Sequence, residues 1–194
     1  MFIDKRSSVM IVSSSKKAAE YLTGVLPKDD YSPVITVESA GDAKRRLVDT
    51  PCDIVIINTP LKDDFGLELA VDISEKDASC VALLVKSEYY EQVSYKAEDY
   101  GIITVAKPSS TPVILQSVRM LVAMSAKMRR LEKKASTLEM KMEEIRLVNR
   151  AKLLLIEQLK MSEAQAHRYI EKQAMDRCVT KRTIAESIIS TYNK

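Results

Sequence analysis

Short apolar runs alternate with amphipathic stretches along the first part of the chain. Between the runs, near residues 15–26, 40–49, 66–75 and 88–99, apolar residues recur at helical spacing. Runs this short, rich in Val and Ile, are typical of strands buried on both faces of a parallel sheet. Five such repeats predict a doubly wound α/β domain, with functional groups at the carboxyl ends of its strands. The predicted strands are Ser8–Ser13, Pro33–Val37, Asp53–Asn58, Cys80–Val85 and Ile102–Ala106.

A heptad pattern follows this domain and predicts a coiled coil that makes the chain a homodimer. Glycine and proline are absent from residue 113 onward, so the last helix of the α/β domain is expected to continue into it. Asn149 lies at an a position, where a polar residue fixes the register of two strands. The alternative is that the stripe packs on the chain's own α/β domain. The a positions are Leu121, Met128, Ala135, Met142 and Asn149, and the d positions are Met124, Leu131, Leu138, Ile145 and Lys152.

Charges at the flanking heptad positions favour a parallel pair over most of this helix. The g residues Lys127 and Lys134 would face Glu132 and Glu139 of the other strand. Opposite charges at these positions set partner and orientation. Lys141 would face Arg146, so the far end is expected to be weaker.

The last part of the chain predicts three short amphipathic helices packed as a bundle. Ser162 followed by Gln165 is a capping box, which starts a helix, and Thr180 is a suitable cap for the next. Ala166, Ile170 and Ala174 would form one narrow apolar face. The remaining apolar positions are Leu153, Leu154, Ile156 and Leu159 for the first helix, and Ile184, Ile188 and Ile189 for the last.

Charge is distributed unevenly over these regions, which we place at residues 1–120, 121–149 and 150–194. Residues 1–114 hold 13 Lys and Arg against 18 Asp and Glu, a net charge of −5. Residues 115–149 hold 8 against 4, and residues 150–194 hold 9 against 5, so each carries +4. An acidic front and a basic back are expected when one end binds nucleic acid, although long surface helices are often basic too.

Other sequence features exclude several classes of protein. Cys52, Cys80 and Cys178 fit neither a zinc pattern nor a disulfide framework, which favours a reducing, cytoplasmic location. The N-terminus has charged residues where a signal peptide needs apolar ones, and no apolar run approaches the roughly 18 residues of a membrane span. With one histidine, no Gly-rich phosphate loop and no nucleophile motif, the chain is expected not to be an enzyme and to need no cofactor or metal.

The predicted strand ends carry the residues by which residues 8–120 resemble the response-regulator receiver domain. The landmarks are Ile11-Val12-Ser13-Ser14, Ile56-Ile57-Asn58, the Gly66-Leu67 that opens the third helix, and Lys107-Pro108. The resemblance implies a (βα)5 fold of the two-component signalling systems. Pro108 predicts a turn after Lys107 and allows a cis peptide bond there.

Most of the receiver's chemical positions are changed. Ser13 and Ser14 replace the acidic pair that would hold Mg²⁺, and hydroxyls are far weaker ligands for this cation. Asn58 replaces the aspartate that accepts a phosphoryl group, Lys86 replaces a hydroxyl, and only Lys107 is retained. We therefore predict a pseudo-receiver that is not phosphorylated. The loop acids Asp63 and Asp64 form either a solvated turn or a cation site, and Lys86 with Lys107 leaves either an anion pocket or a pair neutralised by a neighbour.

The C-terminal motifs resemble the ANTAR domain, an RNA-binding module of bacterial transcription antiterminators, over about residues 148–190. They are Ala151-Lys152, Ser162-Glu163 with Ala166-His167-Arg168, Ala174-Met175-Asp176-Arg177, and Ala185-Glu186 with Ile188-Ile189. The resemblance implies that a dimer binds two small hairpins in a nascent leader RNA and blocks formation of the terminator.

Basic and aromatic residues of this region are the candidates for RNA contact, because cations anchor phosphates and rings stack on bases. Each also has a structural interpretation, such as Lys152 ending the coiled coil or Tyr169 packing in the bundle. The phosphate candidates are Lys152, Lys160, Arg168, Arg177, Lys181 and Arg182, and the stacking candidates are His167 and Tyr169.

Two other functions compete with RNA binding. The helices starting near 162 and 180 could form a DNA-binding helix-turn-helix, although the last one offers mostly packing residues. The chain could instead be a protein-interaction adaptor whose pseudo-receiver docks a sensor. Some ANTAR proteins with unphosphorylatable receivers are controlled by a partner, so the resemblance implies control by a regulatory sensor protein or a ligand.

Overall fold

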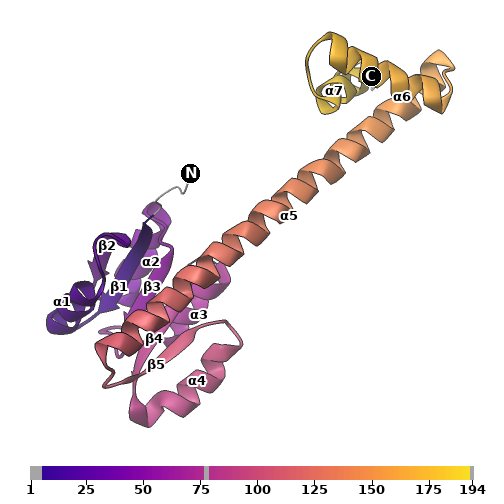
Figure 1. The fold of residues 1–194 in the computed structure, drawn as a ribbon. Coiled ribbons are helices and arrows are strands. Elements are labelled where there is room, and N and C mark those ends of the chain that lie inside the picture. The colour runs from indigo at the N-terminus through magenta and orange to yellow at the C-terminus, as the bar shows by residue number, and fades with distance from the viewer. Residues whose placement is uncertain (1–5, 77–78, 193–194) are drawn as a thin grey trace. The chain divides into compact units, whose positions relative to one another are not determined.

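The computed structural model describes residues 6–76 and 79–192. These residues form two compact units that divide between Arg130 and Leu131. The first is an α/β unit and the second a helical unit (Figure 1). None of the helices in the described ranges is both long and apolar enough to cross a membrane.

The α/β unit is built on a five-stranded sheet in which every pair of neighbours is parallel. The strand order is β2-β1-β3-β4-β5, the doubly wound order that the alternating pattern predicts. The register places Ser13 opposite Asn58 and Lys86 opposite Lys107. The sheet therefore brings the ends of its strands to one edge. The strands are β1 (Ser7–Ser13), β2 (Tyr31–Val37), β3 (Ile54–Asn58), β4 (Cys80–Lys86) and β5 (Ile103–Lys107).

Helices cover both faces of this sheet. α1 (Lys16–Val25) and the first part of α5 (Thr111–Leu159) pack on one face, with Val9 and Ile11 of β1. α2 (Ala40–Asp49), α3 (Leu67–Lys76) and α4 (Tyr90–Glu98) pack on the other, with Met10 and Val12. Successive strand residues thus point to opposite apolar layers, which explains the unbroken hydrophobic runs in the sequence.

A 3₁₀ turn at Ser87–Tyr89 precedes α4, and the Lys107–Pro108 peptide bond is cis.

α5 is a single helix of 49 residues, as the absence of glycine and proline predicts. Its early turns belong to the core of the α/β unit, where Ile114, Val118 and Leu121 are buried against the sheet. This corrects the assignment of Leu121 to the dimer seam, because a side chain that is fully buried in its own domain has no surface left for a partner. At this heptad position the helix packs on the chain's own α/β unit, which was the alternative to a dimer seam.

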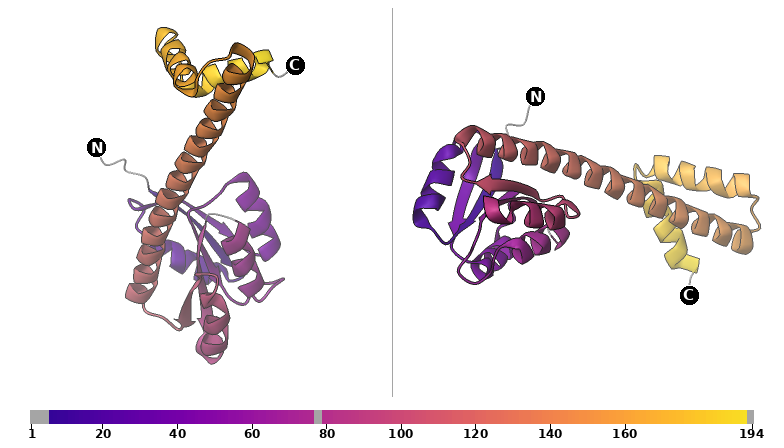
Figure 2. Two further views of the ribbon diagram at one scale, coloured as in Figure 1. Left: turned by 90° about the vertical axis from the view of Figure 1, so that its right-hand side faces the viewer. Right: turned by 90° about the horizontal axis from the view of Figure 1, so that it is seen from below.

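The helical unit consists of the later turns of α5 with α6 (Glu163–Asp176) and α7 (Lys181–Tyr192). Figure 2 shows α6 and α7 gathered at the C-terminal end of α5. Ala166, Ile170 and Ala174 form the buried face of α6, as predicted, and the alanines leave room for close helix packing. The full core is Ala151, Leu155, Ala166, Ile170, Ala174, Ile184, Ala185 and Ile188.

The wall that α5 contributes differs from the prediction. Ala151 and Leu155 are the buried residues, whereas Leu153 is 59% and Leu159 45% exposed. Leu154 and Ile156 pack at the margin of the core, as Ile189 does in α7. A run of consecutive leucines does not indicate which face of the helix is buried. Residues 151 and 155 lie on one face of the helix, and residue 153 lies on nearly the opposite one.

Local capping sets the ends of the short helices. The predicted capping box is present, since the backbone N–H of Gln165 donates to Ser162 Oγ and the N–H of Ser162 donates to Gln165 Oε1. Thr180 caps α7 by accepting from the N–H of Thr183 at 3.2 Å. Lys160 and Cys178 have φ values of 55° and 52°, the left-handed conformation that ends a helix.

Candidate nucleic-acid interface

The strand ends of the α/β unit form a closed polar cluster where a receiver has its phosphorylation site. Asn58 Nδ2 donates to Ser13 Oγ at 3.0 Å, and Lys107 Nζ donates to Asn58 Oδ1 at 2.7 Å. Lys107 also donates to the carbonyl oxygen of Thr59. Ser13 is 2% and Asn58 8% exposed. Both ends of the Asn58 carboxamide are therefore bonded inside the protein.

The two other predicted positions lie at the edge of this cluster. Ser14 Oγ donates to the carbonyl oxygen of Pro60 at 3.0 Å, away from Asn58. Lys86 pairs with exposed Glu88 at 3.4 Å. Burial lowers the pKa of the Lys107 ammonium, and the positive charge of Lys86 lowers it further. Glu88 neutralises Lys86, whereas Lys107 meets only the uncharged oxygens of Asn58 and Thr59, so the contacts support neutralisation by a neighbour for Lys86 alone.

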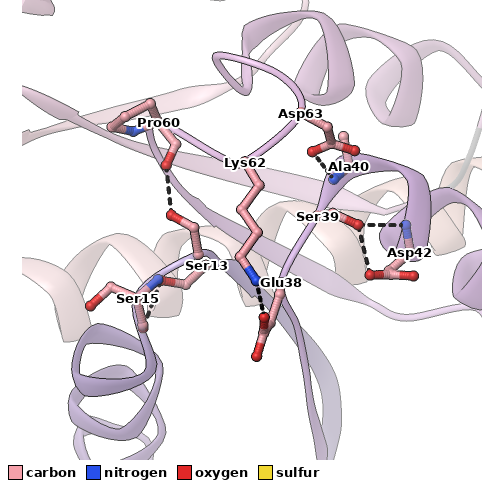
Figure 3. A network of polar contacts seen from close by, with 10 residues as sticks. Ser13, Ser15, Glu38, Ser39, Ala40, Asp42, Pro60, Lys62 and Asp63 are labelled. Atoms are coloured by element: carbon pink, nitrogen blue, oxygen red, sulfur yellow. Dashed lines mark hydrogen bonds and ion pairs between the residues drawn. The ribbon is translucent and has the colours of Figure 1, made fainter.

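Asp63 acts as a helix cap. Its Oδ1 accepts from the N–H of Ala40 at 2.9 Å (Figure 3). Its Oδ2 accepts from the N–H of Gly41 at 3.0 Å. These backbone bonds lower the pKa of the Asp63 carboxyl. Asp63 therefore adds a long-range cap to the start of α2, where Ser39 supplies the local one. Asp64 turns back on its own loop and accepts from the N–H of Gly66. Within the described ranges, no three or more His, Cys, Asp or Glu residues cluster as metal ligands would.

Three helices of the helical unit line one open groove of about 340 Å³, here called the basic groove. α5 provides most of its lining, while α6 adds His167 and α7 adds Lys181. Ile145 and Val148 give it an apolar part, and Glu144 is its acidic residue. The remaining lining residues are Lys141, Asn149 and Lys152.

Two lysines and the histidine of the basic groove are bonded to carboxylates of α6. Lys181 Nζ lies 2.5 Å from Glu171 Oε1, and His167 Nε2 lies 3.3 Å from the same oxygen. Lys152 Nζ lies 3.0 Å from Glu163 Oε1. The hydrogen bond from Lys181 lowers the pKa of Glu171, and that from Lys152 lowers the pKa of Glu163. The Lys181 and Glu171 side chains are 42% and 38% exposed, and Glu163 is 76% exposed beside a Lys152 side chain at 16%, so water reaches at least one partner of each pair and weakens it.

The other candidate residues lie elsewhere on the helical unit. Tyr169 and Arg177 line a second groove of about 190 Å³, whose wall includes Leu155 and Tyr192. Arg182 pairs with Glu186 on α7 at 2.8 Å. Arg168 is an exposed residue of α6, and Lys160 follows the end of α5. The basic groove thus brings together three of the eight predicted residues, namely Lys152, His167 and Lys181, while Tyr169 and Arg177 share the second groove.

Lys141 and Asn149 are groove residues that the sequence pattern does not assign to RNA contact. The heptads give Asn149 the role of a register device in the coiled coil and Lys141 that of a charged flank. The available signal is their spacing, because residues 141, 145, 148, 149 and 152 share one face of a helix. The same spacing is expected for a coiled coil, so it does not distinguish the two roles. Only the packing of α6 and α7 shows that this face of α5 borders a groove.

Comparison with known proteins identifies the helical unit. The ANTAR domain family matches residues 136–189, beginning within the stretch that the heptads assign to the linker. The transcriptional regulatory protein PdtaR of Mycobacterium tuberculosis, strains CDC 1551 / Oshkosh and ATCC 25618 / H37Rv, is 29% identical over 140 residues. That alignment covers 72% of this chain and 68% of the relative.

Solved receiver structures resemble the α/β unit. The signal receiver domain of an HD domain-containing protein from Pseudomonas fluorescens Pf-5 aligns with a TM-score of 0.60 at 20% identity, covering 67% of this chain and 96% of that one. The chemotaxis response regulator CheY4 of Vibrio cholerae aligns with a TM-score of 0.54 at 15% identity, covering 60% and 99%. At these identities the likeness establishes the fold alone. The chain therefore carries an ANTAR domain at residues 136–189, and ahead of it lies a unit with a receiver-like fold.

Proposed function

We propose that this protein is a dimeric RNA-binding antitermination regulator, which binds hairpins in a nascent leader RNA and prevents formation of the terminator. The ANTAR match and the likeness to PdtaR support RNA-binding antitermination in general. The basic groove is the observation that carries the proposal for this chain. It gathers lysines from α5 and α7 and the His167 ring from α6 beside an apolar surface, which is the combination of phosphate anchors and stacking surface that single-stranded RNA requires.

The dimer is supported by the apolar heptad positions of the helical unit. Leu131 is 50%, Leu138 62% and Met142 65% exposed, so a regular stripe of large side chains lies in water in the single chain. Pairing two such helices would bury this stripe. It would also bring the lysines at g positions close to the glutamates at e positions of the other helix. Two ANTAR units in one particle would then bind two hairpins with a gain from effective concentration.

Control without phosphorylation is supported by the closed cluster at the strand ends. Asn58 has no anionic oxygen to accept a phosphoryl group, and Lys107 and Ser13 already satisfy its carboxamide. Regulation is then left to a sensor protein or a ligand that binds the dimer. The DNA-binding alternative is disfavoured because Ile184, Ala185 and Ile188 of α7 are buried and unavailable to a major groove.

A salt-titrated binding assay tests RNA recognition. The full-length protein is offered a two-hairpin leader RNA, a single hairpin and duplex DNA of equal length. We expect tightest binding to the two-hairpin RNA, weakened by Arg168→Gln and by Lys181→Gln, with a salt slope lower by about 0.7–1 for each phosphate that the variant no longer neutralises. Equal and steeply salt-dependent binding to all three would contradict the proposal and favour the adaptor function.

A matched pair of variants tests the dimer. Leu138→Glu should dissociate it, since the charge enters the apolar seam, and Thr137→Glu should not, since residue 137 lies outside the a and d positions. Sedimentation equilibrium measures the effect. The advantage of two-hairpin over single-hairpin RNA should disappear in Leu138→Glu alone. A dimer that survives this substitution would show that the seam lies elsewhere.

A further inference from the structure

We propose that the basic groove receives one unpaired nucleotide of the RNA, whose base edge is read by the Asn149 carboxamide. This inference rests on the proposed function and names the subsite that would give it specificity. Lysines at positions 141, 152 and 181 would hold the phosphates on either side of that nucleotide. Asn149 is thereby assigned to RNA recognition rather than to the register of a coiled coil.

The groove has the size and surface for a single base. Its volume of about 340 Å³ lies at the lower end of small-ligand sites, which span about 300–1,000 Å³. Ile145 is 59% exposed and Val148 partly buried, so an apolar surface is available to the face of a base. The ring of His167, about half exposed, lines the same groove and can stack on it. Unpaired loop bases are recognised by this kind of stacking.

Asn149 is the side chain equipped to read a base edge. It is exposed, lines the groove, and its carboxamide makes no hydrogen bond to another residue of the described part of the chain. This group offers two N–H donors and a carbonyl acceptor without carrying charge. Amide side chains pair with base edges in a bidentate way, whereas an ammonium group binds phosphates with little sequence preference.

Charge complementarity selects RNA as the occupant of this groove. Lys141 and Lys152 come from α5 and Lys181 from α7, so positive charge reaches the groove from two helices. Glu144 lines the groove, and Glu163 and Glu171 hold Lys152 and Lys181 in the free protein. Lys141 forms no ion pair among the residues that the structure describes. A phosphate can therefore bind Lys141 directly. At Lys152 and Lys181 a phosphate can replace the glutamate carboxylates, because its hydrogen bonds to ammonium groups are charge-assisted.

The same face carries the last positions of the heptad pattern, which makes a second copy of the chain the competing occupant. Ile145 and Lys152 are d positions, and Asn149 is an a position. A seam that continued through them would cover the groove. The repulsive pair expected from Lys141 and Arg146 weakens the coiled coil here, so the apolar seam is expected to end before Ile145 and leave the groove open.

The experiment separates these two occupants with Asn149→Ala in the full-length protein. Binding to a single leader hairpin is measured by fluorescence anisotropy, and dimerisation by sedimentation equilibrium. We expect the hairpin dissociation constant to rise roughly 5- to 150-fold, the range of one base-edge contact, with the dimer constant unchanged. Replacing the loop bases one at a time by abasic nucleotides should identify one position whose removal adds nothing further in Asn149→Ala.

Lysine variants supply the matched control. Lys141→Gln should weaken hairpin binding and lower the salt slope, whereas Lys172→Gln, an exposed α6 residue outside the groove, should have a clearly smaller effect. Unchanged hairpin binding in Asn149→Ala, or a change in the dimer constant instead, would overturn the inference while leaving the proposed function standing. Failure of the wild-type protein to bind the hairpin at all would overturn both.

Discussion

The α/β unit and the helical unit differ in the exposure and bonding of their polar side chains. At the strand ends of the α/β unit, Ser13, Asn58 and Lys107 bond to one another, and both serine and asparagine are nearly inaccessible. Around the basic groove of the helical unit, Lys152 pairs with exposed Glu163, Lys181 pairs with half-buried Glu171, and Asn149 is exposed. Buried groups that bond to one another are costly to separate, whereas ion pairs that reach water are weak and exchange readily. This difference is in keeping with the proposal that RNA binds to the helical unit.

The two units also differ in the size of their cores. The two faces of the sheet are covered by clusters of 18 and 13 buried residues, whereas the helical unit has one cluster of eight. Small cores bury too little surface to tolerate defects. The helical unit should therefore respond far more strongly than the α/β unit to the truncation of one side chain.

The largest expected effect is that of Leu155→Ala. Leu155 is 1% exposed in the eight-residue core, so its truncation should cost about 2–5 kcal/mol and unfold the ANTAR unit first. Chemical denaturation followed by circular dichroism should show an early loss of helix and a later transition of the α/β unit. RNA binding should fall with the first transition.

Leu153→Ala is the matched control, because it makes the same change two residues away on a side chain that is 59% exposed. It should change the stability of the ANTAR unit by less than about 1 kcal/mol. Equal destabilisation by the two variants would mean that α5 packs through a different face from the one described.

A smaller effect is expected for Asp63→Asn, through the pH dependence of stability. The pKa of Asp63 is lower in the folded than in the unfolded protein, so the ionised carboxylate stabilises the fold. This stabilisation is fully present above the unfolded pKa of about 3.9, and it is lost as the pH falls through the folded pKa. The variant should melt at a lower temperature than the wild type near neutral pH, and the difference should vanish in acid. Asp29→Asn, the same change in an exposed turn, is the matched control.

The smallest effect is expected for Asn58→Asp, which restores the carboxylate alone. Incubation with acetyl phosphate and Mg²⁺ should still give no phosphorylated protein by intact mass, because Ser13 and Ser14 supply no carboxylate for the cation. Adding Ser13→Asp and Ser14→Asp to the same chain tests whether the metal site is the missing part. Phosphorylation of the single variant would show that the two serines are sufficient and would remove the basis for calling this a pseudo-receiver.

Much of the fold follows from local patterns that need no knowledge of distant contacts. Observed strand ends lie within two residues of those expected, as in β1 and β5, because the apolar runs stop where the chain leaves the sheet. Ser162 and Thr180 cap their helices as their spacing predicts. The replacement of a reactive aspartate by Asn58 likewise depends only on residue identity and on the order of the strands.

What the sequence by itself determined is the succession of a receiver-like domain, a long helix and a basic ANTAR region, since each rests on periodicity or on a motif. Only the tertiary structure decided which face of α5 is buried in each unit. It placed Leu121 and Leu155 inside, left Leu153 and Leu159 outside, and set Lys141 and Asn149 beside His167 and Lys181. The physical reason is that one heptad-like stripe can satisfy either a partner helix or the chain's own core. The choice depends on contacts between residues far apart in sequence, as does the use of Asp63 to cap a helix that begins 23 residues before it.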